Sequence, residues 1–302
     1  MTPSDCADVT VIIPAWRAAE TIRRALASVA RQTVRPSEVV VVDDGSDDGT
    51  SDAARAMAAD LSPTALKVIR QENSGPGAAR NRAICEASGS VLAFLDADDE
   101  WLPEKLETSL SALRDGIVLV AHNITTLDDS GVQPFDCARH LPAGTDAFVA
   151  LFKRGFVSTA TVVCRAETVR AAGGFDETLR SGQDYELWLR IAKAHPMGFA
   201  VLPGFLTRYH VLPGSVSSRV GLRRRCSIEI ARRHAPALRG RTSNPISVAG
   251  LRIAFITAEA FISYRHRRDW LSAFAVAASL PWTLAVVVFG YVRSRGANGG
   301  PA

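Results

Sequence analysis

Four consecutive valines at positions 39–42 restrict the fold of this chain more than any other feature. A strand that is β-branched and apolar on both faces is typical of a parallel sheet covered by helices on each side. Three other apolar runs, at residues 10–13, 66–69 and 91–95, have the composition of further buried strands. The chain is therefore expected to build a sheet from at least these four segments.

Helical patterns separate these runs. Residues 20–32 place Ile22, Leu26 and Val29 on one face, and residues 78–87 form a second helical segment. The alternation of strand and helix over the first hundred residues predicts an α/β fold of the doubly wound, nucleotide-binding type.

Three carboxylates, Asp96, Asp98 and Asp99, directly follow the apolar run 91–95. A buried strand does not accommodate them, so they are expected at the carboxyl edge of the sheet, where open α/β sheets bind ligands. Two Asp residues separated by one residue can hold a divalent cation through oxygen, and the cation can hold a phosphate. The alternative is a solvated acidic turn that caps the helix starting near Pro103.

Two other strands end in residues suited to a ligand. Pro14 and Trp16 close the first strand, and Asp44 closes the valine strand before Gly45. Trp16 can stack on a base or belong to the core, and Asp44 can accept from a base N–H or serve only the turn. Together with the acidic turn, these residues indicate a pocket with an aromatic ring, a hydrogen-bond acceptor and a metal site.

The Gly75-Pro76-Gly77 turn lacks the third glycine of the dinucleotide fingerprint, and Arg80 stands where that glycine would fall. We interpret this segment as a helix start that approaches phosphates, and not as an NAD site.

These motifs, in this order, resemble glycosyltransferase family 2, the inverting sugar transferases with the GT-A fold. The resemblance rests on residues 11–16, 42–46, 79–81 and 94–99, and it covers roughly residues 9–218. It implies an α/β GT-A nucleotide-sugar-binding sandwich with a mostly parallel sheet over residues 1–218. A basic helical region, residues 219–302, follows it.

The resemblance also implies roles for individual residues. The donor-nucleotide site would contain Pro14, Trp16, Asp44, Arg80 and Asp96. Asp98 would be the principal ligand of a Mn²⁺ or Mg²⁺ ion, with Asp96 beside it.

The acceptor side is marked by Gly-Gly-Phe-Asp-Glu at residues 173–177 and by Asp184 in the first turn of a predicted helix. The helix dipole favours a carboxylate there, so a structural role is one interpretation. The resemblance instead makes Asp184 the general base. The sequence departs from the family at Gln183, where Glu is common, so a second carboxylate is not expected.

His210 belongs to a segment, residues 209–217, of the kind that closes over the donor diphosphate in this family. His210 can contribute a metal or phosphate contact, or it can be an ordinary loop histidine. Further strands are predicted at residues 117–121 and 157–164, with a hairpin turn at residues 128–131.

The charge is distributed unevenly. Residues 1–204 carry 20 Lys and Arg against 28 Asp and Glu, whereas residues 205–302 carry 15 against 3. The basic region should face an anionic partner, and its apolar helices lack the recognition chemistry of a nucleic-acid-binding segment. A membrane surface is therefore the expected partner, and the alternative is a solvated basic surface with no partner.

Residues 270–292 contain no charge, and this run is long enough to span a bilayer, although Pro281 would kink or split it. Three arrangements remain open for the run. It can be a spanning or re-entrant helix, an interfacial helix on anionic headgroups, or part of a helical hairpin docked on the catalytic domain.

The sequence thus predicts a metal-dependent inverting glycosyltransferase of polysaccharide or cell-envelope biosynthesis. It would move a sugar from a UDP-, GDP- or dTDP-linked donor to a glycan or lipid-linked acceptor. The expected location is the cytoplasmic side of a membrane, with the protein either peripheral or anchored by its C-terminal helix. The alternatives are a GT-A-like binding module without turnover and a nucleotidyltransferase, although no Gly-rich, Lys-containing loop follows Ile13.

Overall fold

The computed structural model describes residues 6–128, 131–211 and 219–293. The chain divides into two compact units. The first contains Met1–Ala147, Phe156–Thr178 and Gln183–Leu212. The second contains Phe148–Gly155, Leu179–Gly182 and Pro213–Ala302, so it takes two short segments from within the first 218 residues.

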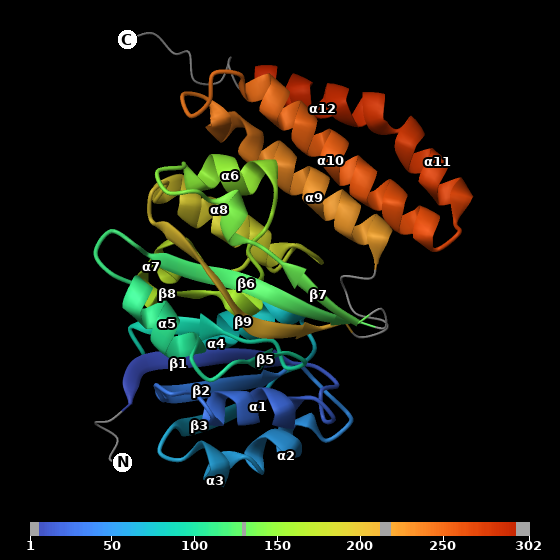
Figure 1. Ribbon diagram of the computed structural model, residues 1–302. Helices are drawn as coiled ribbons and strands as arrows, with labels where there is room; N and C mark the ends of the chain where they lie inside the picture. The colour runs from blue at the N-terminus through green and yellow to red at the C-terminus, as the bar shows by residue number, and fades with distance from the viewer. Residues whose placement is uncertain (1–5, 129–130, 212–218, 294–302) are drawn as a thin grey trace. The chain divides into compact units, whose positions relative to one another are not determined.

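Four parallel strands form one half of the sheet, in the order β3-β2-β1-β4 (Figure 1). They are β1 (Ala7–Ala15), β2 (Pro36–Asp43), β3 (Ala65–Arg70) and β4 (Val91–Phe94). The four valines lie in β2 and are fully buried. Because β1 and β3 pair with β2 in parallel on either side, the prediction of a buried strand in a parallel sheet is confirmed.

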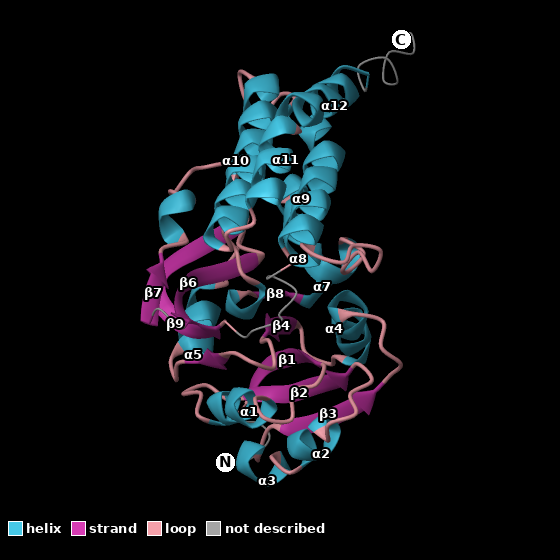
Figure 2. Cartoon of the chain, turned by 90° about the vertical axis from the view of Figure 1, so that its right-hand side faces the viewer, coloured by secondary structure: helices cyan, strands magenta, loops and turns pink. Residues whose placement is uncertain are grey.

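Helices cover both faces of these strands. The helices α1 (Ile22–Ala30), α2 (Thr50–Arg55) and α3 (Ala58–Leu61) lie on one face, and α4 (Pro76–Glu86) packs on the other (Figure 2). The strand order reverses between β1 and β4, so the carboxyl ends of these two strands flank the switch point at which α/β sheets bind ligands.

The other half of the sheet is mixed. It continues as β4-β8-β6-β9-β5, with β7 paired to β6. These strands are β5 (Glu100–Trp101), β6 (Leu119–Asp128), β7 (Gly131–Phe135), β8 (Val163–Arg165) and β9 (Phe199–His210). Since β8 is antiparallel to β4 while β9 is parallel to β6, the sheet is parallel from β3 to β4 and mixed beyond.

The strand predicted at residues 157–164 is shorter than expected. Thr159–Thr161 form a 3₁₀ turn, η3, and the sheet is joined only from Val163. The carbonyl of Ala160 accepts hydrogen bonds from Trp101 Nε1 at 2.7 Å and Thr207 Oγ1 at 3.3 Å. Side-chain donors thus satisfy this carbonyl in place of a strand partner. The predicted hairpin joins β6 to β7, and its tip, residues 129–130, lies outside the described residues.

The remaining helices of this unit are η2 (Ala138–His140), α5 (Lys105–Ala112), α7 (Ala166–Ala171) and α8 (Gln183–Ala194). The aromatic side chains of Phe94, Trp101 and Trp188 are among its largest fully buried groups.

The second unit is helical and contains most of α6 (Ala147–Lys153), then α9 (Val220–His234), η5 (Ala235–Leu238), α10 (Pro245–His266), α11 (Trp270–Ala278) and α12 (Leu280–Arg293). Helix α10 packs against α9, α11 and α12 (Figure 1). Two stretches, Pro245–His266 and Trp270–Phe289, have the length and apolar composition needed to cross a membrane. The second is interrupted at Ser279, just before Pro281, as the sequence predicts.

Candidate active site

The acidic turn follows β4 at the switch point of the sheet, and little solvent reaches it. Asp99 is fully buried, and its Oδ1 accepts a hydrogen bond from the His210 backbone N–H at 3.0 Å. The other oxygen, Asp99 Oδ2, has no hydrogen-bond partner. Asp96 and Asp98 are half-buried. The turn is therefore not the solvated cap of the alternative interpretation.

Burial and mutual repulsion make these carboxylates hard to ionise together. Burial, followed by the charge of Asp96, raises the pKa of the Asp98 carboxyl to about 6. Burial, Asp96 and Asp98 raise the pKa of Asp99 well above its usual range. Among the described residues, the positive charge near the turn does not offset these effects on Asp98 and Asp99.

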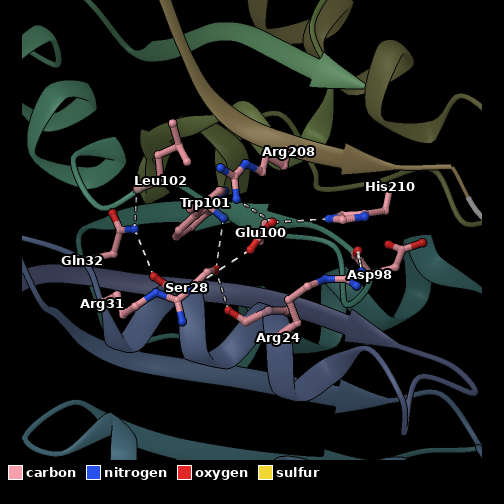
Figure 3. Close-up of polar contacts among 11 residues, drawn as sticks. Arg24, Ser28, Arg31, Gln32, Asp98, Glu100, Trp101, Leu102, Arg208 and His210 are labelled. Atoms are coloured by element: carbon pink, nitrogen blue, oxygen red, sulfur yellow. Dashed lines mark hydrogen bonds and ion pairs between the residues drawn. The ribbon is translucent and has the colours of Figure 1, made fainter. Parts of the chain in front are cut away.

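Two arginines neutralise part of this charge. Arg80 of α4 lies 2.5 Å from Asp96 Oδ1. Arg24 of α1 donates to the backbone carbonyl of Asp98 at 2.5 Å (Figure 3). Within the described ranges, no Lys, Arg or His side chain forms an ion pair with the Asp98 carboxylate itself.

Glu100 connects the acidic turn to the end of β9. Its carboxylate lies 3.2 Å from Arg208 Nη1, 4.0 Å from Arg31 Nη2 and 3.6 Å from His210 Nε2 (Figure 3). Burial and the charge of Arg24 lower the pKa of His210 below its usual value, although Glu100 opposes this. The imidazole is therefore neutral near neutral pH, which is the form that binds metals. Of residues 209–217, predicted to close over the donor, residues 212–217 lie outside the described part of the chain.

Trp16 stands at the carboxyl end of β1 with an exposed ring. Its side chain is 54% exposed, and the Arg17 guanidinium lies 5.2 Å from the ring centroid. The backbone N–H of Arg17 donates to Ser46 Oγ at 2.9 Å, which joins the ends of β1 and β2. Trp16 is thus not a core residue, and Pro14 lies two residues before it in β1.

Asp44 is buried just after β2, and its carboxylate holds a loop. Asp44 Oδ1 accepts from Gln71 Nε2 at 2.8 Å and from the Ser74 N–H at 2.9 Å. Its Oδ2 accepts from the Gly75 N–H at 2.8 Å. Because this loop opens α4, Asp44 also helps to position Arg80. A contact between Asp44 and a base stays a prediction.

Asp184 is the second residue of α8. Its Oδ2 accepts a hydrogen bond from Thr159 Oγ1 at 2.8 Å, and its Oδ1 accepts from the Tyr185 N–H at 2.8 Å. Both donors are neutral, and the side chain is half-buried. Each carboxylate oxygen retains a lone pair, so Asp184 can accept a further proton donor.

Three aromatic rings connect the acidic turn to the helix of Asp184. Phe94, Phe175 and Trp188 have centroids 5.7, 5.9 and 6.1 Å apart. The Arg80 guanidinium lies 5.4 Å from the Phe175 ring. Arg80 therefore contacts both Asp96 and the ring of Phe175, which packs against Trp188 of α8. The expectation that Trp188 is packed is confirmed, because its side chain is fully buried.

Asn81 fixes the Gly-Gly-Phe segment onto α4. Its Oδ1 accepts from the Phe175 N–H at 2.8 Å, and its Nδ2 donates to the Phe175 carbonyl at 2.9 Å and to Glu177 Oε1 at 2.7 Å. Gly174 has a φ of 70°, and a Cβ atom there would lie 2.6 Å from Asn81 Oδ1. These contacts explain why this segment requires glycine beside Asn81.

The acidic turn suits a cation whose coordination a substrate completes. In the described part of the chain, no group of three or more His, Cys, Asp or Glu side chains can hold a metal ion by itself. Mg²⁺ is commonly bound by one or two carboxylates together with substrate phosphates. Such a site is consistent with the Asp98 carboxylate, which forms no ion pair in the described part of the chain, with the neighbouring Asp96, and with Asp99 Oδ2, which has no hydrogen-bond partner.

Related sequences identify the family. Residues 10–159 match the family model described as Glycosyl transferase family 2. The chain is 30% identical over 213 residues to UDP-Glc:alpha-D-GlcNAc-diphosphoundecaprenol beta-1,3-glucosyltransferase WfgD of Escherichia coli, and the match covers 70% of this chain and 79% of WfgD. The chain belongs to glycosyltransferase family 2. It is also 36% identical over 204 residues to the succinoglycan biosynthesis protein ExoU of Rhizobium meliloti. That match covers 63% of this chain and 58% of the length of ExoU.

Solved structures confirm the GT-A fold. TarS residues 1–349 of S. aureus, in complex with UDP-GlcNAc, gives a TM-score of 0.67 at 20% identity and covers 94% of this chain and 89% of that structure. The mannosyltransferase PcManGT of Pyrobaculum calidifontis, in complex with GDP-Man and Mn²⁺, gives 0.63 at 20% identity, with coverage of 97% and 88%. At this identity the likeness concerns the fold, and the roles of individual residues stay predictions.

Proposed function

We propose that this protein is an inverting glycosyltransferase that moves a sugar from a nucleotide-sugar donor to a hydroxyl group of a glycan or lipid-linked acceptor. The acidic turn at the switch point carries the proposal. The half-buried Asp98 carboxylate has no ion pair among the described residues, and a cation bound with the donor diphosphate would supply the missing partner.

The donor is a UDP-, GDP- or dTDP-linked sugar. The exposed ring of Trp16 offers a face on which a base can stack, and Pro14 lies near the same end of β1. Asp44 holds the loop at Ser74 and Gly75 through its carboxylate. TarS and PcManGT, which share the fold, have been solved with UDP-GlcNAc and GDP-Man, and this supports a nucleotide sugar here.

Asp98 and Asp96 would hold a Mn²⁺ or Mg²⁺ ion, with His210 as a proposed further contact. Bound there, the cation supplies positive charge to the departing diphosphate. Arg80 holds Asp96 in place through its ion pair, and Arg24 holds the backbone of Asp98. The Mn²⁺ in the PcManGT complex supports a divalent ion on this fold.

Asp184 acts as the general base. The acceptor oxygen forms a bond to the anomeric carbon, while the bond from that carbon to the diphosphate oxygen breaks and leaves its electron pair on the diphosphate. The acceptor proton passes to Asp184. Thr159 and the Tyr185 N–H keep the carboxylate in one orientation. A single displacement inverts the anomeric centre, and no second acid is needed at Gln183.

The proposed setting is polysaccharide or cell-envelope biosynthesis at the cytoplasmic side of a membrane. ExoU is named for succinoglycan biosynthesis, and the name of WfgD states a diphosphoundecaprenol-linked acceptor. The two apolar helical stretches of the second unit support attachment to a membrane surface.

A donor screen tests this function. The protein is incubated with UDP-, GDP- and dTDP-sugars in the presence of Mn²⁺, Mg²⁺ or EDTA, and release of the nucleoside diphosphate is measured. Release from one class of donor that requires the metal and is lost in Asp98→Ala would support the proposal. Tight nucleotide binding without release or transfer for any donor would instead favour a binding module. A product with retained anomeric configuration would refute the single displacement.

A further inference from the structure

Every exposed side chain between Trp270 and Phe289 is apolar. They are Trp270, Leu271, Phe274, Ala275, Ala277, Ala278, Pro281, Trp282, Ala285, Val286 and Phe289. Leu271 is 87% exposed and Trp282 is 76% exposed. A helix on a water-facing surface normally shows charged and polar groups on its outer side. The outer face of α11 and α12 is thus suited to an apolar medium.

Polar groups of the same helices face inward. Thr283 is buried, and Arg224 of α9 donates to Ser279 Oγ at 2.7 Å and to Thr283 Oγ1 at 3.4 Å. Ala273, Val287 and Tyr291 are buried on the same side. Polar groups inside and apolar groups outside is the arrangement of protein surfaces that contact lipid.

The position of Arg224 argues against a spanning helix. Its guanidinium contacts Ser279, which lies near the middle of the uncharged run 270–292. A span would carry this contact, and the charge with it, toward the bilayer centre, where a charge is costly. Helix α10 does not fit a span either, because it buries Arg252 within the helical unit and exposes Glu259.

We propose that α11 and α12 lie in the plane of the interface of an anionic bilayer, with their outer face immersed among the acyl chains. Arg265, Arg267 and Arg268 are exposed immediately before Trp270, where they can meet headgroup phosphates. The excess of 15 Lys and Arg over 3 Asp and Glu in residues 205–302 complements such a surface. This attachment rests on the membrane setting proposed above but not on the sugar-transfer chemistry.

Vesicle flotation of the full-length protein tests the attachment. Phosphatidylcholine vesicles with and without phosphatidylglycerol are compared. The double variant Phe274→Glu/Trp282→Glu should lower the vesicle-bound to free ratio at least about tenfold. Leu251→Glu, at a 71% exposed apolar position of α10, is the matched control and should bind as wild type does. Changing Arg265, Arg267 and Arg268 together to Gln should lower binding to anionic vesicles about 10- to 100-fold and leave binding to neutral ones unchanged.

Depth measurements on the wild-type protein avoid any dependence on variant folding. Tryptophan fluorescence should be quenched more by lipids brominated near the headgroup than by lipids brominated near the chain ends, and this difference should shrink in Trp282→Phe. Stronger quenching from the chain ends, with resistance to extraction at alkaline pH, would establish a spanning helix and overturn the proposal. Failure to bind vesicles, with a dimer in lipid-free solution that Phe274→Glu/Trp282→Glu dissociates, would assign the face to a second copy of the chain. Donor turnover in the same preparations reports on the proposed reaction independently of attachment.

Discussion

Replacing Asp184 by Asn should separate its chemical role from its structural one. The carboxylate accepts two hydrogen bonds, from Thr159 Oγ1 and from the Tyr185 N–H. Asn keeps an acceptor oxygen for Tyr185, and its amide can donate to the Thr159 hydroxyl, which is able to accept. Since neutral hydrogen bonds replace charge-assisted ones, we expect the free energy of unfolding to fall by about 1 kcal/mol, or roughly 2–4 °C in Tm.

The loss of catalytic activity in Asp184→Asn should be much larger than its loss of stability. An amide cannot take the acceptor proton, and removal of a general base lowers kcat by about 10²–10⁴, which corresponds to about 2.7–5.5 kcal/mol of transition-state stabilisation. Initial rates at saturating donor and acceptor measure this loss, and calorimetry should give an unchanged donor Kd. Asp269→Asn is the matched control: it removes a carboxylate from the start of α11, where Asp269 accepts from the Ser272 N–H, and it should leave kcat unchanged.

Two results would refute this reasoning. A well-folded Asp184→Asn protein with wild-type kcat would remove Asp184 from the chemistry. A fall in Tm of more than about 10 °C would show that the carboxylate is chiefly structural. Gln183→Ala should cost far less activity than Asp184→Asn, because Gln183 has no titratable group.

Asp98→Asn should weaken Mn²⁺ binding about tenfold or more when a nucleoside diphosphate is present, as followed by electron paramagnetic resonance; unchanged binding would place the metal elsewhere. Trp16→Ala should weaken nucleoside diphosphate binding by about 1–3 kcal/mol in calorimetry if the ring stacks on the base, and an equal Kd would exclude stacking. Lys105→Met replaces a lysine whose Nζ is buried without a hydrogen-bond partner and lies 3.8 Å from the Trp101 ring centroid. Burial lowers the pKa of Lys105 well below its usual value. Because the folded chain holds this proton less tightly than the unfolded chain does, the contribution of Lys105 to stability should rise with pH up to about 10. The variant should gain on the order of 1 kcal/mol near pH 7 and lose that gain near pH 10 in denaturant melts, and a less stable variant near pH 7 would contradict this account.

The four parallel strands β1 to β4 can be predicted from the sequence because local apolar patterns define them. The valine run in β2 and the apolar stripe of α1 are each buried as their spacing predicts. The η3 turn is different, because the donors to Ala160 come from Trp101 and Thr207, which are 59 and 47 positions away. No local pattern indicates such contacts, so a strand is the natural prediction there.

In the candidate site, too, some residues can be predicted from local sequence and others depend on tertiary contacts. Asp96 and Asp98 can be predicted because carboxylates are incompatible with the buried strand that they follow. Arg24 and Thr159 cannot, because one lies on an ordinary helix and the other in a segment that looks like a strand; their contacts with Asp98 and Asp184 exist only in the folded chain. The exposure of Trp16 likewise depends on the tertiary arrangement.

The hydrogen bonds between Asn81 and Phe175 suggest where acceptor specificity can be exchanged between related transferases. Asn81 binds the main-chain N–H and carbonyl of Phe175, so the segment entering α8 is docked partly through its backbone. A foreign segment grafted after Gly174 can make the same two bonds, provided that the glycine and the buried ring at position 175 are kept. Chimaeras joined at this position should therefore retain donor recognition while presenting new side chains beside Asp184, which makes the junction a natural site for recombining donor and acceptor halves.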